Sequence, residues 1–230
     1  MKVGILGAGH IGKTLVRELS RTGYDVKVAN SRGPETIDAS IFASGGRAVT
    51  IEQAVEDVDI LILSIPLNRL PEIAPKIAGL PEDTVVIDTS NYYPMRDTEI
   101  GDVEAGEVES VWVSRQLGRT VVKAWNAIGS DSFARLGKPA GHPDRIAIPV
   151  AADNDRDRRV AMALVGDRSP GASSRARQFT VLILRLARCP MHWPLRKDPG
   201  CRSGEICPSL RSTRGLATRR AIPTRAFLCV

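Results

Sequence analysis

The stretch GAGHIG at residues 7–12 decides the fold of this chain, because of what stands on either side of it. Before it, residues 2–7 form a short apolar run of the kind that makes a buried strand. After it, residues 10–23 carry apolar side chains on one helical face and end at a glycine. G-x-G-x-x-G is a weak pattern alone, but between a strand and a helix it predicts a dinucleotide-binding turn.

Each glycine of this turn has a separate expected role. Gly7 permits the tight turn, Gly9 lets the backbone approach a pyrophosphate, and Gly12 lets the helix pack against the strand. The helix N-terminus offers free N–H groups and the positive end of its dipole to the phosphates. His10 stands beside that phosphate path, either as a ligand contact or simply as a polar loop residue.

Outward from the turn, residues 1–166 alternate between apolar runs and helical periodicity. This alternation predicts an α/β fold of the Rossmann type, a doubly wound and mostly parallel sheet. Strands are expected at 2–7, 25–30, 59–65, 84–90, 120–126 and 145–153, and helices at 10–23, 34–46, 52–58, 68–79 and 154–165. Ligands bind such sheets beyond the carboxyl ends of the strands, so function is expected at 7–12, 30–36, 64–68, 88–94 and 124–130.

The overall composition is globular, with 43% hydrophobic and 25% charged residues. No apolar run approaches the roughly 20 residues that a membrane span needs. The first residues, MKVGILGAG, are too short and too interrupted by glycine for a signal peptide. We therefore expect a soluble, cytoplasmic protein without a membrane partner.

The second expected strand ends in VANSRGPET, residues 28–36, where NAD-binding chains usually carry an acid for the ribose hydroxyls. Asn30 takes that place, so no carboxylate there would repel a 2′-phosphate. Ser31 adds a hydroxyl donor, and Arg32 adds a planar fork of donors that suits phosphate and can stack on adenine. These residues favour NADP(H) over NAD(H), the alternative being a polar turn with a solvated Arg32.

The other end of the nucleotide is expected beside SIPL, residues 64–67, where Ile65 and Leu67 could form an apolar wall. Asn91 and Asn126 follow later strands and are placed to orient a carbonyl or an amide, whereas Trp125 is more typical of a core. No Ser–His–Asp set and no metal-ligand spacing of Cys or His occurs in residues 1–166. Hydride transfer between two cofactors is compatible with this, because the protein mainly holds two rings face to face.

Five stretches together resemble the bacterial branch of the NADPH-dependent deazaflavin (coenzyme F420) reductases. They are MKVGILGAGHIGKTLVRELSRTG (1–23), ANSRGPET (29–36), SIPL (64–67), DTSNYYPMRD (88–97) and VVKAWNAI (121–128). The resemblance covers about residues 1–165. Pyrroline-carboxylate reductases share the N-terminal pattern but add a long helical domain that this chain lacks.

The resemblance implies a Rossmann domain that binds NADP(H) and exchanges a hydride with a small-molecule acceptor, with coenzyme F420 as the candidate co-substrate. It places Ser31 and Arg32 at the 2′-phosphate and the acceptor ring near Asn126 and Ile128, and it names no certain catalytic residue. With the reasoning above, the expected cofactor-binding residues are Gly7, Ala8, Gly9, His10, Ile11, Gly12, Asn30, Ser31, Arg32, Ser64, Ile65, Pro66 and Asn91.

Residues 167–230 differ from the rest in charge and composition. They hold 13 Lys and Arg against 3 Asp and Glu and all four cysteines, whereas residues 1–166 hold 19 against 23. Beyond the short run at 181–187 they show no sustained helical or strand period. We therefore divide the chain into an NADP-binding Rossmann domain, 1–166, and a basic tail rich in Arg, Pro and Cys, 167–230.

Three interpretations of this tail stay open. A nucleic-acid or membrane-surface arm would use the positive charge, but one Lys against 12 Arg and the lack of an aromatic platform make nucleic acid an unexpected partner. A zinc site would use Cys189, His192, Cys201 and Cys207, yet the paired Cys-x2-Cys spacing is missing. Composition favours the third, an out-of-frame read from about codon 166.

The choice bears on function, because members of the resembling family complete the acceptor pocket, and often a dimer, with residues beyond 165. An intact segment would allow catalysis and a homodimer. A scrambled segment would leave a non-catalytic NADP-binding module, either a redox sensor or a disabled enzyme.

Overall fold

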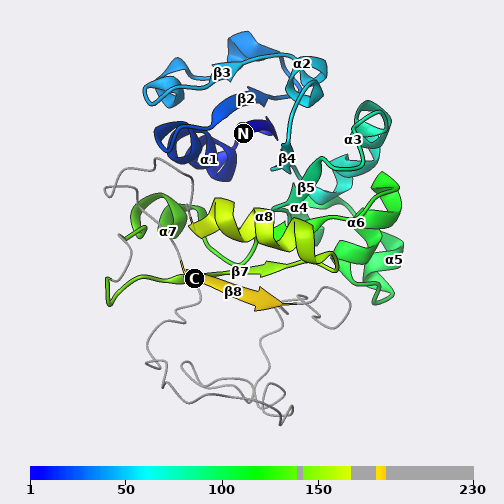
Figure 1. Ribbon diagram of the computed structural model, residues 1–230. Helices are drawn as coiled ribbons and strands as arrows, with labels where there is room; N and C mark the ends of the chain where they lie inside the picture. Colours follow the sequence, from blue (N-terminus) through cyan, green and yellow to red (C-terminus); the bar gives the residue numbers. More distant parts are fainter. Residues whose placement is uncertain (139–141, 167–179, 185–230) are drawn as a thin grey trace. The chain divides into compact units, whose positions relative to one another are not determined.

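Short apolar runs build one sheet in the computed structural model, which describes residues 1–138, 142–166 and 180–184 (Figure 1). The strand order is β3-β2-β1-β4-β5-β6-β7-β8. Their bounds are β1 Lys2–Leu6, β2 Asp25–Ala29, β3 Arg47–Ala48, β4 Ile60–Leu63, β5 Val85–Asp88, β6 Val122–Ala124, β7 Ala147–Ala151 and β8 Thr180–Leu184. The chain order reverses between β1 and β4, which makes the end of β1 the topological switch point. The predicted Rossmann-type fold is confirmed.

Strand directions follow the expectation of a mostly parallel sheet. Every pair from β3 to β6 is parallel, β7 runs antiparallel to β6, and β8 is parallel to β7. β8 coincides with the apolar run of the tail. The other tail residues, including the candidate zinc ligands Cys189, His192, Cys201 and Cys207, lie outside the described residues, so the three interpretations of the tail stay predictions.

Helices cover both faces of the sheet, because successive strand residues point to opposite sides. On one face the core includes side chains of α1 (His10–Arg21), α7 (Ser130–Arg135) and α8 (Asp155–Gly166). On the other it includes side chains of α2 (Ile51–Val55), α3 (Leu70–Ile77), α5 (Gly101–Glu104) and α6 (Glu109–Leu117). Within the described part of the chain, no helix has both the length and the apolar character of a membrane span.

The predicted helix at 34–46 is wrong. Two short 3₁₀ turns replace it, η1 (Pro34–Thr36) and η2 (Ala39–Phe42). Between them Ile37 is extended, and the Asp38 carboxylate accepts a hydrogen bond from the Ser40 amide, an Asx turn that competes with helix formation. Four helices between 94 and 135 were not predicted, namely α4 (Pro94–Asp97), α5, α6 and α7. Three of them, α4, α5 and α7, are too short to show a helical period.

Candidate functional site

A pocket of about 410 Å³ opens at the carboxyl ends of β1, β4, β5 and β6. Four of the five segments predicted from the sequence contribute to it, and the segment 30–36 does not. The lining residues are Gly9, His10, Ile11, Ser64, Ile65, Pro66, Thr89, Ser90, Asn91, Tyr93, Arg96, Trp125, Asn126, Ile128, Gly129 and Ser130. The sheet therefore collects loops that lie more than 100 residues apart in sequence into one polar and apolar cleft.

Two glycines of the turn are required by the protein's own packing. Gly7 has φ +110°, and a Cβ there would overlap the carbonyl oxygen of Ser64 on β4's exit loop. A Cβ on Gly12 would overlap the carbonyl oxygen of Gly7, so α1 could not lie so close to β1. The Gly7 amide also donates to the Ala29 carbonyl at 2.8 Å, which ties the turn to the end of β2.

Gly9 is different, because among the described residues no atom beyond its two chain neighbours lies within 4 Å of where its Cβ would stand. Its backbone is extended, with φ −75°, a conformation that any residue adopts. It is the N-cap of α1 and provides no side-chain cap, so the first-turn amides of the helix have no partner from that residue. Gly9 thus leaves a cradle beside a helix N-terminus, which fits a pyrophosphate.

The loop after β2 is organised by Asn30. Its Oδ1 accepts the Arg32 amide at 2.9 Å, and its Nδ2 donates to the Thr36 hydroxyl at 2.8 Å. That hydroxyl donates in turn to the carbonyl of Gly33 at 2.8 Å. Asn30 is therefore engaged in shaping the loop, while the exposed side chains of Ser31 and Arg32 are presented at its tip.

Arg32 has no carboxylate partner among the described residues, so its guanidinium is available to an anion. Glu35 was not among the residues predicted from the sequence, and its carboxylate overlaps the place where a Cβ on Gly33 would stand. It therefore places a negative charge on the same loop, five residues after Asn30. An NADP-binding loop must hold the 2′-phosphate on its Ser31 and Arg32 side, away from that carboxylate.

The exit of β4 contributes Ser64, Ile65 and Pro66 to the pocket as predicted. Leu67 was expected to join Ile65 in an apolar wall, and this expectation is wrong. Its side chain is buried in the core, since it begins the turn η3 (Leu67–Arg69) that leads into α3. Ile128, from the loop after β6, lines the pocket together with Ile65 instead.

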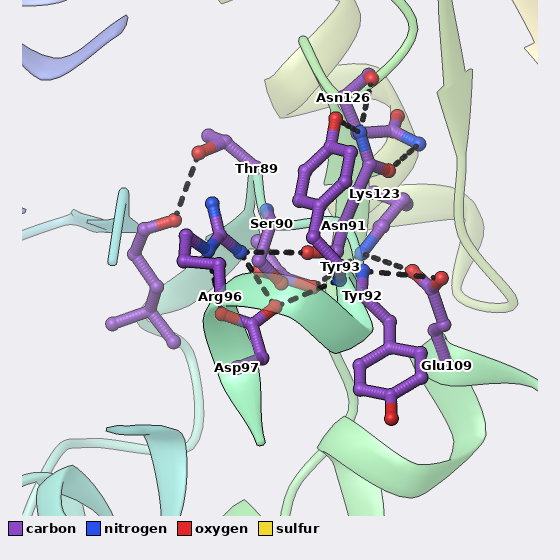
Figure 2. A network of polar contacts seen from close by, with 12 residues as sticks. Thr89, Ser90, Asn91, Tyr92, Tyr93, Arg96, Asp97, Glu109, Lys123 and Asn126 are labelled. Atoms are coloured by element: carbon purple, nitrogen blue, oxygen red, sulfur yellow. Dashed lines mark hydrogen bonds and ion pairs between the residues drawn. The ribbon is translucent and has the colours of Figure 1, made fainter. Parts of the chain in front are cut away.

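Asn91 and Asn126 both line the pocket, and their side chains lie side by side (Figure 2). The Asn91 Nδ2 donates to the Asn126 carbonyl at 2.7 Å, and the Asn126 Nδ2 donates to the Asn91 Oδ1 at 3.2 Å. Trp125 makes this possible by adopting φ +60°, which turns the chain sharply after β6. Such a conformation costs about 1–2 kcal/mol for a residue other than glycine. The Trp125 ring packs in the core against Phe133, as expected.

Trp125, which was expected in the core, also lines the pocket, and six further lining residues were not predicted from the sequence. They are Thr89, Ser90, Tyr93, Arg96, Gly129 and Ser130. Five of them stand within segments that the strand ends had marked, so the polar turns themselves were the signal. The sixth, Arg96, comes from the four-residue helix α4, which has no readable period.

Arg96 and Ser90 bring different groups to this site. The Arg96 guanidinium forms paired hydrogen bonds of 2.6 and 2.7 Å with the buried Asp97 carboxylate and lies over the Tyr93 ring, 4.8 Å from its centroid. It also donates to the Asn91 carbonyl at 2.9 Å. Ser90 is 6% exposed, and its hydroxyl has no hydrogen-bond partner among the described residues. A ligand or a water would remove the cost of that unpaired group, about 1–3 kcal/mol.

The first part of this chain matches a known protein family. Residues 2–92 match the family described as NADP oxidoreductase, coenzyme F420-dependent. The match covers the glycine turn, the Asn30 loop, the β4 exit and Asn91. It confirms, for this part of the chain, the resemblance found in the sequence and the expected class of NADP-linked oxidoreductase.

Solved structures share the fold. A hypothetical protein from Sinorhizobium meliloti is 24% identical with a TM-score of 0.64, over 81% of this chain and 86% of that one. A candidate F420-dependent NADP reductase from Arthrobacter sp. FB24 is 15% identical with a TM-score of 0.58, over 80% and 85%. The 3-hydroxyisobutyrate dehydrogenase of Mycobacterium tuberculosis is 15% identical with a TM-score of 0.56, over 80% and 54%. At these identities the likeness shows the Rossmann fold.

Proposed function

We propose that this protein is an NADP(H)-dependent oxidoreductase that exchanges a hydride between NADP and a deazaflavin-like acceptor, such as coenzyme F420, or another small acceptor. One observation carries the proposal: a single pocket joins the open cradle at Gly9 to the amide groups of Asn91 and Asn126. The first suits a pyrophosphate, and the second suits a ring that carries carbonyl or amide groups.

The residues present fit an extended dinucleotide. The Gly7 amide bonds the end of β2, so the phosphate cradle and the Asn30 loop are neighbours at the switch point. Ser31 and Arg32 would hold the 2′-phosphate, and the first turn of α1 would hold the pyrophosphate. Asn91 and Asn126 would orient the nicotinamide end, where the unpaired Ser90 hydroxyl also stands. The bound nicotinamide would supply or receive the hydride, two electrons and one proton moving together.

The acceptor is expected on the side of the pocket that Asn126 and Ile128 line. Ile65 and Ile128 offer apolar contacts to a flat ring and exclude water from its face. The protein's task here is to hold two rings at a fixed distance, since effective molarity can replace acid–base catalysis when the reactants carry the chemistry. Turnover with a deazaflavin would separate this proposal from a module that binds NADP without catalysis.

The first test is nucleotide preference. We expect the full chain to bind NADPH at least tenfold more tightly than NADH, and Arg32→Ala to remove most of that preference while leaving NADH binding unchanged. Charge-assisted hydrogen bonds contribute about 1.5–3 kcal/mol, and 1.4 kcal/mol corresponds to a factor of ten. Titration by nicotinamide fluorescence measures both constants.

Arg17→Ala is the matched control, because it removes one exposed arginine from α1 outside the pocket. It lowers the net charge by the same amount, so any difference between the two variants is local. Equal affinity of the wild-type chain for NADPH and NADH would contradict the assignment of the Asn30 loop. Tight NADPH binding without hydride transfer to a deazaflavin would favour the non-catalytic alternative.

A further inference from the structure

Lys123 is a buried cation directly behind the pocket. The whole residue is 1% exposed and stands at the centre of the three-residue strand β6. Its Nζ lies 2.7 Å from Asp88 Oδ2 and 3.8 Å from Glu109 Oε2. Burying these charges costs several kcal/mol per ion, and only good mutual geometry offsets that cost. Because removing these charges from water costs so much free energy, packing alone does not explain why the cluster is buried.

Sheet register explains how the three groups meet. Lys123 pairs with Asp88 across the parallel strands β6 and β5. Its neighbours Val122 and Ala124 pack on the α1 face, so the Lys123 side chain points to the opposite face, where α6 lies. Glu109 occupies the first turn of α6, where the helix dipole favours an acid.

Both carboxylates also hold the backbone of the pocket loop. Asp88 Oδ1 accepts the Ser90 amide at 2.9 Å, and Glu109 Oε1 accepts the Tyr92 amide at 3.2 Å. Asn91 stands between these two anchored amides and reaches Asn126 (Figure 2). Each acid therefore has one oxygen facing Lys123 and the other hydrogen-bonded to the loop. The ion cluster thus holds the loop backbone on both sides of Asn91.

We propose that Lys123 is a positioning residue for the pocket. By fixing the carboxylates of Asp88 and Glu109, it sets the backbone from Ser90 to Tyr92 and so aims the Asn91 amide and the Ser90 hydroxyl at the nicotinamide end of a bound nucleotide. Lys123 is buried and does not line the pocket, so it acts through these groups and not on the ligand. The inference rests on the proposed function for the identity of the ligand.

Two variants separate positioning from stability. Lys123→Met removes the cation that faces the buried carboxylates of Asp88 and Glu109, which destabilises the fold. The triple variant Lys123→Met, Asp88→Asn, Glu109→Gln carries no buried charge at these positions and keeps an oxygen acceptor for each loop amide, so it avoids the cost of an uncompensated buried charge. Thr84→Val is the control, because it removes a buried hydrogen bond to the Val58 carbonyl at the other end of β5, far from the loop.

The probes are NADPH and 2′,5′-ADP, which lacks the nicotinamide half. We expect Lys123→Met to weaken NADPH binding tenfold or more and to change 2′,5′-ADP binding by less than twofold. In the triple variant the urea midpoint should return to within experimental error of the wild type, while NADPH binding stays at least fivefold weaker. Thr84→Val should lower the urea midpoint and leave the affinity ratio of the two probes unchanged.

A parallel loss for both probes, or full recovery of NADPH affinity in the triple variant, would overturn the proposal. A second measurement needs no ligand: the NMR signals of the Asn91 and Asn126 side-chain amides should shift in the triple variant and stay in place in Thr84→Val. Unchanged signals there would also overturn it. A wild-type chain that binds neither probe would contradict the proposed function instead, and the NMR result would still decide the role of Lys123.

Discussion

Gly9 and Gly12 belong to the same G-x-G-x-x-G pattern, but glycine is needed at the two positions for different reasons. Gly12 is required by the approach of α1 to Gly7, whereas in the described part of the chain no atom beyond the two neighbours of Gly9 lies within 4 Å of where its Cβ would stand. A methyl group at Gly12 therefore strains the fold, and a methyl group at Gly9 occupies room that the fold does not use. The distinction makes Gly9 a residue whose side-chain size matters to a ligand and not to folding.

Gly9→Ala is expected to fold with an unfolding midpoint close to that of the wild type and to lose NADPH affinity by tenfold or more. The added methyl group would stand where the pyrophosphate approaches the backbone. Isothermal titration and urea denaturation measure the two effects separately. Gly79→Ala is the matched control, since no atom lies within 4 Å of a Cβ there and the residue is outside the pocket. If Gly9→Ala binds NADPH as tightly as the wild type, the pyrophosphate does not bind beside Gly9.

At the scale of elements, Tyr92 links the pocket loop to the short helices that follow it. Its hydroxyl donates to Glu104 Oε1 at 2.8 Å in α5 and accepts the amide of Ile100 at 3.2 Å. Its own amide is held by Glu109 of α6. The segment between β5 and α6 has little regular structure, so these contacts take the place of a longer helix.

Burial and the hydrogen bond to Glu104 raise the pKa of the Tyr92 hydroxyl above its ordinary value of 10.0. A group whose pKa is raised by folding contributes stability that is complete below its unfolded pKa and is lost as pH rises through the folded pKa. We therefore expect wild type and Tyr92→Phe to differ by a constant unfolding free energy up to about pH 9, and the difference to shrink above pH 10.

Urea denaturation of the two proteins between pH 7 and pH 11 measures this difference directly. Other tyrosines and the lysines titrate in both proteins alike, so their effects cancel in the comparison. If the difference in unfolding free energy grows above pH 10, the fold stabilises the ionised form of the Tyr92 hydroxyl. That result would contradict the expected effect of the neighbouring Glu104 carboxylate.

At the scale of the whole molecule, the pocket is formed by loops from both sides of the switch point. The strands that position these loops also form the hydrophobic core. A ligand that binds only the folded chain must then stabilise the entire domain. NADPH at a hundred times its dissociation constant is expected to raise the unfolding free energy by about 2.7 kcal/mol. Thermal or urea unfolding with increasing NADPH measures the effect.

At the same NADPH concentration, Gly9→Ala should be stabilised by no more than about 1.4 kcal/mol, because a tenfold weaker variant is then at ten times its own dissociation constant. If NADPH does not change the unfolding of the wild-type chain, the folded protein does not bind the nucleotide. Stabilisation of both proteins alike would instead place the binding outside the Gly9 cradle.

Local patterns were enough to predict most of this architecture. Apolar runs predicted six of the eight strands to within a few residues, because a strand buried on both faces must be apolar along its length. The strand ends then marked four segments that do line the pocket. The helix predicted at 34–46 failed because the Asp38 carboxylate accepts the Ser40 amide and the Asn30 amide donates to the Thr36 hydroxyl. Hydrophobic periodicity does not record such local side-chain bonds, which compete with a helix.

By itself, then, the sequence determined the sheet, the glycine turn and the presence of Asn30 where NAD-binding chains carry an acid. Each of these depends on residues that are adjacent in the chain. Tertiary structure alone decided that Lys123, Asp88 and Glu109 share one buried cluster and that Arg96 stands at the pocket. The physical reason is register: charges can be buried only where partners meet them, and strand pairing brings residues 35 positions apart to 2.7 Å.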